Sequence, residues 1–154
     1  MTIAATLLLV VALTWLSCVD IREFRLPDIG TLLLVAVGIL LSFARGGPNL
    51  AVAALVAAAL GFVSLWIVAF IYHRYRGVNG LGLGDAKLLA AAGAWLGPWM
   101  LAPVVFIGAI LGLCYALWLR TTGPQLSSET RIPFGPFLSA SFLFLWCLHV
   151  ASLV

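Results

Sequence analysis

Long apolar blocks separated by short polar connections dominate the pattern of this chain. Five blocks are clear, at about Thr2–Val19, Ile29–Ala44, Leu50–Tyr72, Trp99–Leu119 and Phe134–Val154. Each is close to the roughly 20 residues that a helix needs to cross a hydrocarbon core, although the second is short. The pattern therefore predicts an all-α polytopic membrane protein.

A sixth apolar block, Ala86–Leu96, is too short to be assigned by length alone. Its eleven residues reach only about 16 Å as a helix, roughly half of a hydrocarbon core. The block is followed by Gly97-Pro98, which ends any helix there. It is either a re-entrant segment or a sixth span completed by the glycine-rich residues that precede it.

The distribution of basic residues favours the sixth span. With six spans, seven of the eight Lys and Arg residues fall on one side of the membrane and only Arg45 on the other. With five spans the division becomes five against three. Because basic residues concentrate in cytoplasmic loops, we expect about six spans, both termini outside, and the loops after spans one, three and five in the cytoplasm.

The amino-acid composition agrees with a membrane location and excludes a soluble domain. Hydrophobic residues make up 64% of the 154 residues and charged residues 8%, against roughly 25% charged in soluble domains. We expect one transmembrane domain over residues 1–154. The N-terminal apolar block lacks a basic segment before it and a cleavage site, so it is predicted to be a retained span. The net charge of +3 is spread over loops and does not suggest nucleic-acid binding.

The three cysteines give no sign of a metal or redox site. Cys18, Cys114 and Cys147 stand alone in apolar sequence, and the chain has no CxxC pair. They are predicted to be buried thiols that pack as small hydrophobic side chains. No cofactor or metal is expected.

Two of the five acidic residues fall where an apolar block meets its polar connection. In the six-span topology Asp20 ends span one and Asp85 begins span four, both at the cytoplasmic face. Two carboxyl groups from distant parts of the chain are thereby expected at one depth. Ionisable residues at the edge of a span are costly and tend to be functional.

The segment before Asp85 is unusually rich in glycine. Gly80, Gly82 and Gly84 occupy every second position, a pattern that suits neither a stable helix nor a packed strand. Non-helical backbone at membrane depth is tolerated where it lines protein or water. We expect an unwound, water-accessible segment leading into a short fourth span.

Paired aspartates in an apolar setting favour acid–base chemistry on a water molecule. Two adjacent carboxylates cannot both ionise cheaply, so one keeps its proton. One can then act as a base toward water and the other as an acid toward the substrate. This is the arrangement of aspartic proteases.

Simpler interpretations remain for each residue. Asp20 could end a helix and form a salt bridge with Arg22 or Arg25. Asp28, which follows Pro27, could cap the second span. Asp85 could be only a helix cap, and Lys87 could either balance the charge of the aspartates or contact lipid phosphate. The Gly93-x-x-x-Gly97 pattern is more typical of helix packing than of chemistry.

The sequence also resembles a known family. The stretches DIREFRLPD at residues 20–28, GLGDAK at 82–87 and RIPFGPF at 131–137 resemble the motifs of type IV prepilin peptidases, which are GxGD-type membrane aspartyl proteases. The resemblance covers nearly the whole chain. The three stretches together are specific, whereas a lone GxGD would be weak.

The resemblance implies a function and roles for the residues. Asp20 and Asp85 would be the catalytic aspartates, and Asp28 an accessory residue after the Leu-Pro step. The substrates would be prepilins or pseudopilins, whose basic leader is cut at the cytoplasmic face of the bacterial inner membrane while their apolar helix stays in the bilayer. Many members also carry an N-terminal methyltransferase domain with CxxC motifs, and methyl transfer is not expected here.

Other classes fit the sequence less well. A rhomboid-like serine protease would need a Gly-x-Ser nucleophile, and a zinc protease would need HExxH. A small proton- or cation-coupled transporter could use the same two acids, but the chain shows no internal repeat. A catalytically silent scaffold in a pilus or secretion assembly is the third possibility.

Overall fold

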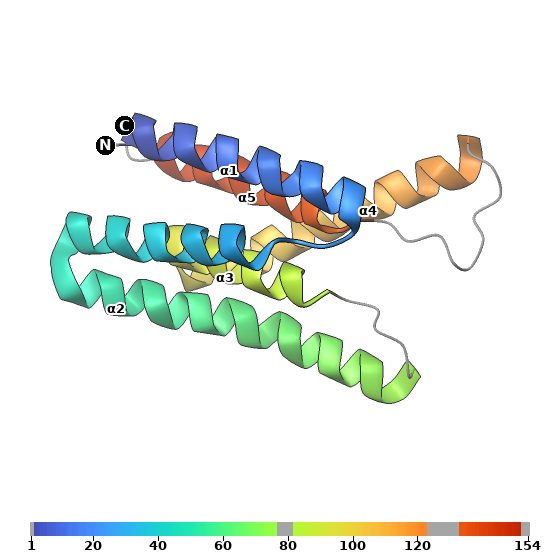
Figure 1. The fold of residues 1–154 in the computed structure, drawn as a ribbon, viewed down its shortest axis with the longest axis horizontal. Helices are drawn as coiled ribbons and strands as arrows, with labels where there is room; N and C mark the ends of the chain where they lie inside the picture. The colour runs from blue at the N-terminus through green and yellow to red at the C-terminus, as the bar shows by residue number, and fades with distance from the viewer. Residues whose placement is uncertain (1, 77–81, 123–132, 152–154) are drawn as a thin grey trace.

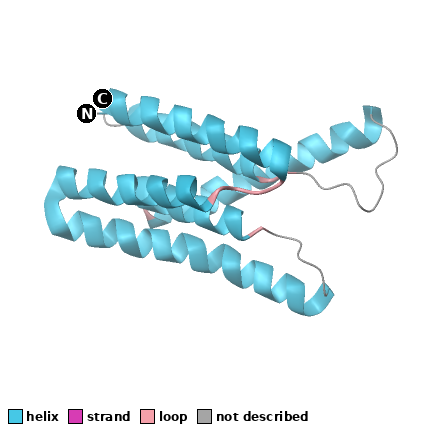
Figure 2. Cartoon of the chain, in the orientation of Figure 1, coloured by secondary structure: helices cyan, strands magenta, loops and turns pink. Residues whose placement is uncertain are grey.

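A computed structural model describes residues 2–76, 82–122 and 133–151, and the described residues form helices without strands (Figures 1 and 2). The helices are α1 (Thr2–Glu23), α2 (Asp28–Arg76), α3 (Leu83–Leu96), α4 (Leu101–Thr122) and α5 (Gly135–Ala151), with a short 3-10 turn, η1 (Pro98–Met100), before α4. The prediction of an all-α protein is confirmed.

Helix α2 consists of two arms that fold back on each other (Figure 1). The break lies at Gly46 and Gly47, whose backbone angles are not helical. Gly47 has a φ of 69°, a region that glycine enters without steric cost, and Pro48 then begins the second arm. The two arms, residues 28–45 and 48–76, correspond to the second and third apolar blocks of the sequence.

Helix α3 forms the centre of the structure. Eleven of its fourteen residues are buried, and it packs mainly on α2. Toward the first arm of α2, the Trp95 indole Nε1 donates a hydrogen bond of 2.8 Å to the Leu34 carbonyl. Toward the second arm, the backbone at Gly93 lies so close to Ala57 that an added Cβ would sit 2.4 Å from the Ala57 oxygen. The absence of a side chain at Gly93 therefore permits close packing of α3 on the second arm of α2.

Three helical segments in the described part of the chain are long and apolar enough to cross a membrane: Ile3–Glu23, Asp28–Tyr75 and Pro98–Thr122. The second contains both arms of α2. Helix α5 is apolar but has only 17 residues, and α3 has 14, or about 21 Å of length. The expected count of about six spans is thus not confirmed, although the apolar helices fit a membrane protein.

The outer surfaces of the helices are apolar as well. Large side chains such as Trp99, Phe106 and Ile3 are at least two-thirds exposed. The cysteines share this environment, because Cys18, Cys114 and Cys147 are free and exposed. The prediction that they are buried in the protein was wrong. An apolar sequence pattern does not distinguish a side chain that faces lipid from one that faces the protein core.

Helices α1 and α5 run antiparallel and bring the two described ends of the chain together (Figure 1). Near the termini, Trp146 Nε1 donates a hydrogen bond of 3.0 Å to Thr6 Oγ1. At the opposite end, the start of α5 contacts Asp20 in the last turns of α1. Helix α3 also begins at this opposite end, so Asp20 and Asp85 lie at the same end of the bundle.

Candidate active site

Asp20 is a buried acid near the end of α1. Its side chain is 6% exposed, and its Oδ2 accepts a hydrogen bond of 3.0 Å from the backbone N–H of Gly135. Helix α1 ends three residues later, where Phe24 takes a left-handed φ of 52° and donates its N–H to the Asp20 carbonyl. The carboxyl group is therefore held between two helices that are distant in sequence.

Asp85 is the second buried acid, in the first turn of α3. It is 8% exposed, and its backbone N–H donates a hydrogen bond of 3.2 Å to the Gly82 carbonyl. A charge on Asp20 would act on the Asp85 carboxyl, so the two acids lie close enough to interact. This is the juxtaposition that the sequence predicted for the two residues.

The connection between α1 and α2 closes over the start of α3. Leu26 in this connection is buried, and a Cβ on Gly84 would lie 2.8 Å from the Leu26 Cβ. Glycine at position 84 therefore lets the connection approach the backbone of α3 directly beside Asp85. The contact fixes the end of α1, which carries Asp20, relative to the start of α3, which carries Asp85.

The glycine-rich segment is only partly as expected. Gly82 is extended, with φ −73° and ψ 139°, but α3 already begins at Leu83, so Gly84 is helical. Asp85 is thus the third residue of the helix and not its first. Gly80, which was expected in the unwound segment, lies outside the described residues.

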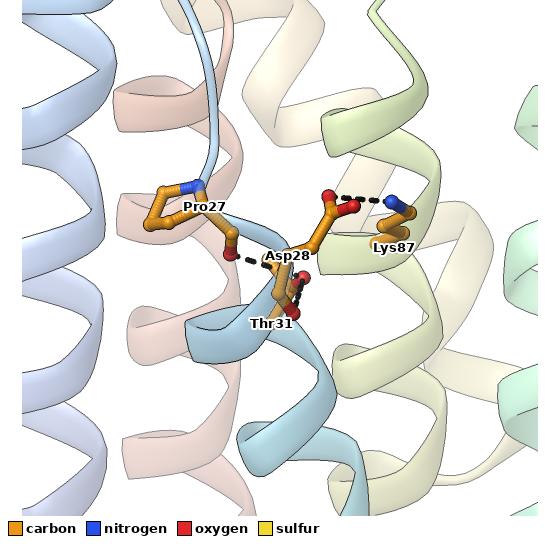
Figure 3. Close-up of polar contacts among 4 residues, drawn as sticks. All are labelled: Pro27, Asp28, Thr31 and Lys87. Atoms are coloured by element: carbon orange, nitrogen blue, oxygen red, sulfur yellow. Dashed lines mark hydrogen bonds and ion pairs between the residues drawn. The ribbon is translucent and has the colours of Figure 1, made fainter.

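Asp28 and Lys87, the latter two residues after Asp85, form an ion pair (Figure 3). Lys87 Nζ lies 2.5 Å from Asp28 Oδ1, and the side chains are 25% and 66% exposed, respectively. Asp28 is the first residue of α2, where a capping role was expected, and its carboxyl instead links α2 to α3. The charge that Lys87 balances is therefore that of Asp28.

The start of α2 is further fixed by Thr31 and Pro27 (Figure 3). The Thr31 hydroxyl donates to the Asp28 carbonyl at 3.0 Å and to the Pro27 carbonyl at 3.4 Å, and the Thr31 N–H also reaches the Pro27 carbonyl. Thr31 is fully buried. Pro27 and Asp28 thus have a structural role in the first turn of α2.

Asp20 forms no salt bridge with Arg22 or Arg25 in the described part of the chain, where the ion pair is that of Lys87 and Asp28. Arg22 and Arg25 are exposed, whereas the Asp20 carboxyl is turned inward to Gly135. Helix termination alone does not account for a carboxyl group buried against another helix. The contact with Gly135 was missed because the sequence assigned no role to that residue, although it lies in the RIPFGPF stretch.

The Asp28–Lys87 pair should contribute little to stability. In a double-mutant cycle with Asp28→Ala and Lys87→Ala, we expect a coupling free energy of about 0.5 kcal/mol, because the Asp28 side chain is 66% exposed. The coupling should decrease at high salt. Thermal unfolding of the four proteins in detergent measures it, and a coupling above about 2 kcal/mol would contradict the assignment as an exposed pair.

The chain matches the sequence model of a known protein family. The model of the type IV leader peptidase family matches residues 7–117, a range that includes Asp20, Asp28, Asp85 and Lys87. No solved structure was found to match the chain.

Several curated proteins named prepilin leader peptidase/N-methyltransferase are similar to this chain. The protein from Burkholderia pseudomallei is 39% identical over 129 residues, which cover 84% of this chain and 41% of the relative. The protein from Dichelobacter nodosus is 40% identical over 130 residues, 82% and 43% of the two chains. The protein from Neisseria gonorrhoeae is 36% identical over 146 residues, 95% and 48%. The chain therefore spans less than half of the length of these relatives.

Proposed function

This chain belongs to the type IV leader peptidase family, and on that basis we propose that it is an aspartic endopeptidase that cleaves the leader from prepilins or pseudopilins. The observation that carries the proposal is the pair of buried, interacting acids, Asp20 and Asp85, at one end of the helices. The relatives that share this region are named for leader cleavage, which supports the same substrate class.

The proposed mechanism assigns complementary roles to the two carboxyl groups. One aspartate, ionised, accepts a proton from water, which then attacks the carbonyl of the scissile peptide. The other, protonated, donates its proton toward that carbonyl oxygen. Burial favours this division, because two neighbouring carboxylates away from bulk water are not both ionised at low cost.

We further propose that the site faces the cytoplasm from the bacterial inner membrane. The six-span assignment places seven of eight basic residues on the side of Asp20 and Asp85, as the positive-inside rule requires of a cytoplasmic face. The substrate partner would keep its apolar helix in the bilayer while its basic leader reaches the two acids. Gly82, Gly84 and the Asp28–Lys87 pair would support the site by fixing the start of α3.

The transporter alternative receives less support. A proton or cation relay near mid-membrane would place its acids in the middle of the spans. Asp20 instead lies three residues before the C-terminal end of α1, and Asp85 lies in the first turn of α3.

Cleavage by the purified protein tests the proposal. The chain reconstituted in liposomes should shorten a prepilin that carries a basic leader, and the Asp85→Asn variant should not. The same liposomes should show no proton or cation flux above that of the variant. Flux without cleavage would replace the peptidase proposal with the transporter alternative.

A further inference from the structure

The first turn of α5 directs one backbone donor to Asp20. Gly135 begins the helix, and its N–H donates to Asp20 Oδ2 at 3.0 Å. Pro136 has no N–H, and the next two N–H groups, of Phe137 and Leu138, donate to the Phe134 carbonyl. Of these three N–H groups, that of Gly135 is therefore the one that donates to a residue of another helix. The start of a helix also favours a negatively charged group.

Position 135 has no room for a side chain. A Cβ there would lie 2.6 Å from Asp20 Oδ2 and 3.0 Å from Asp20 Cγ. Asp20 is itself buried, so the carboxyl group can move away only by displacing other packed atoms. The hydrogen bond and the close contact together determine where the carboxyl group of Asp20 lies.

We propose that Gly135 is a positioning residue for Asp20, a role that rests on the proposed peptidase function. Its N–H occupies one lone pair of Asp20 Oδ2 and holds the carboxyl group in one orientation. Oδ1 then remains as the Asp20 oxygen that binds the attacking water. Gly135 acts through Asp20 and does not itself need to touch the substrate.

Asp20 is also influenced by charges on the other elements packed near it. Helix α3 contributes Asp85, the interacting acid, and Lys87, which is already paired with Asp28 at the start of α2. On α1 itself, Arg22 and Glu23 are exposed. Among the described residues, the Gly135 N–H donates the hydrogen bond that the Asp20 carboxyl accepts.

Two substitutions at this position test the catalytic role. Gly135→Ala should lower kcat for leader cleavage by about 100-fold through misplacement of Asp20, with KM changed less than about 3-fold. Replacement of Gly135 by glycolic acid, which exchanges the N–H for an ester oxygen without adding a side chain, should lower kcat by about 10-fold or more. The control is Gly112→Ala, whose Cβ would lie 3.5 Å from Phe137, an ordinary contact.

A second measurement does not depend on activity. Gly135→Ala should lower the unfolding temperature in the presence of Asp20, and this loss should largely disappear in the Asp20→Ala background, where the clashing oxygen is absent. A wild-type enzyme that cleaves prepilin, with both position-135 variants at full kcat, would overturn the positioning role alone. A wild-type protein that cleaves no prepilin, even with the stability coupling present, would overturn the peptidase function and the catalytic role of Gly135 with it.

Discussion

Replacement of both Asp20 and Asp85 by Asn is expected to lower kcat for leader cleavage no further than either replacement alone. Each single variant should lose about 10⁴- to 10⁶-fold, the range seen when one member of a cooperating catalytic group is removed. The physical reason is that the two carboxyl groups act on one water and one carbonyl. Asn keeps the shape of Asp but neither accepts the proton nor donates an acidic one. Single-turnover cleavage of a prepilin in liposomes measures all three variants.

Asp28→Asn provides the matched comparison for this prediction. Asp28 is a carboxyl group of the same region, but it is 66% exposed and bonded to Lys87. Its replacement should therefore cost far less activity than Asp20→Asn. Equal losses from Asp20→Asn and Asp28→Asn would mean that the first catalytic acid has been misassigned. Losses at Asp20 and Asp85 that multiply in the double variant would mean that the two residues act independently.

The main elements of the fold could be predicted from the apolar pattern because the apolar blocks are uniform and clearly separated by polar or glycine-rich connections. The break at residues 46–47 falls between the second and third blocks, where Gly-Gly-Pro interrupts the apolar sequence. The meeting of Asp20 with Asp85 could also be predicted. In the expected topology two spans separate the two block edges, and an even number of crossings returns the chain to the same face.

The contacts that complete the site could not be predicted in the same way. Gly135 and Asp20 are separated by 115 residues. Every residue except proline has a backbone N–H, so the sequence does not indicate which N–H donates to Asp20. The ion pair between Asp28 and Lys87 spans 59 residues, and local spacing favoured a helix cap instead. Both contacts depend on how α1, α2, α3 and α5 pack, and apolar periodicity is a weak guide to packing when lipid and protein interior are equally apolar.

A single added methyl group at Gly93 should disrupt the packing that supports the site. In Gly93→Ala the new Cβ would lie 2.4 Å from the Ala57 oxygen and 2.7 Å from the Ala57 carbonyl carbon, both backbone atoms of α2. Backbone atoms within a helix do not rotate away, so α3 must shift as a unit. Overpacking of this kind costs about 1–3 kcal/mol, and here the upper end or more is expected. Thermal unfolding in detergent should show this loss of stability as a lower unfolding temperature of the Gly93→Ala variant.

Gly112→Ala separates the packing effect from the general effect of alanine on a helix. Alanine is more favourable than glycine within a helix by about 1 kcal/mol, so Gly112→Ala should be neutral or slightly stabilising. Gly93→Ala receives the same helical gain and should still be destabilised, because its clash is with α2. The shift of α3 also carries Asp85 away from Asp20, so cleavage should fall with stability. A Gly93→Ala protein as stable as Gly112→Ala would show that α2 and α3 do not pack as closely as this arrangement requires.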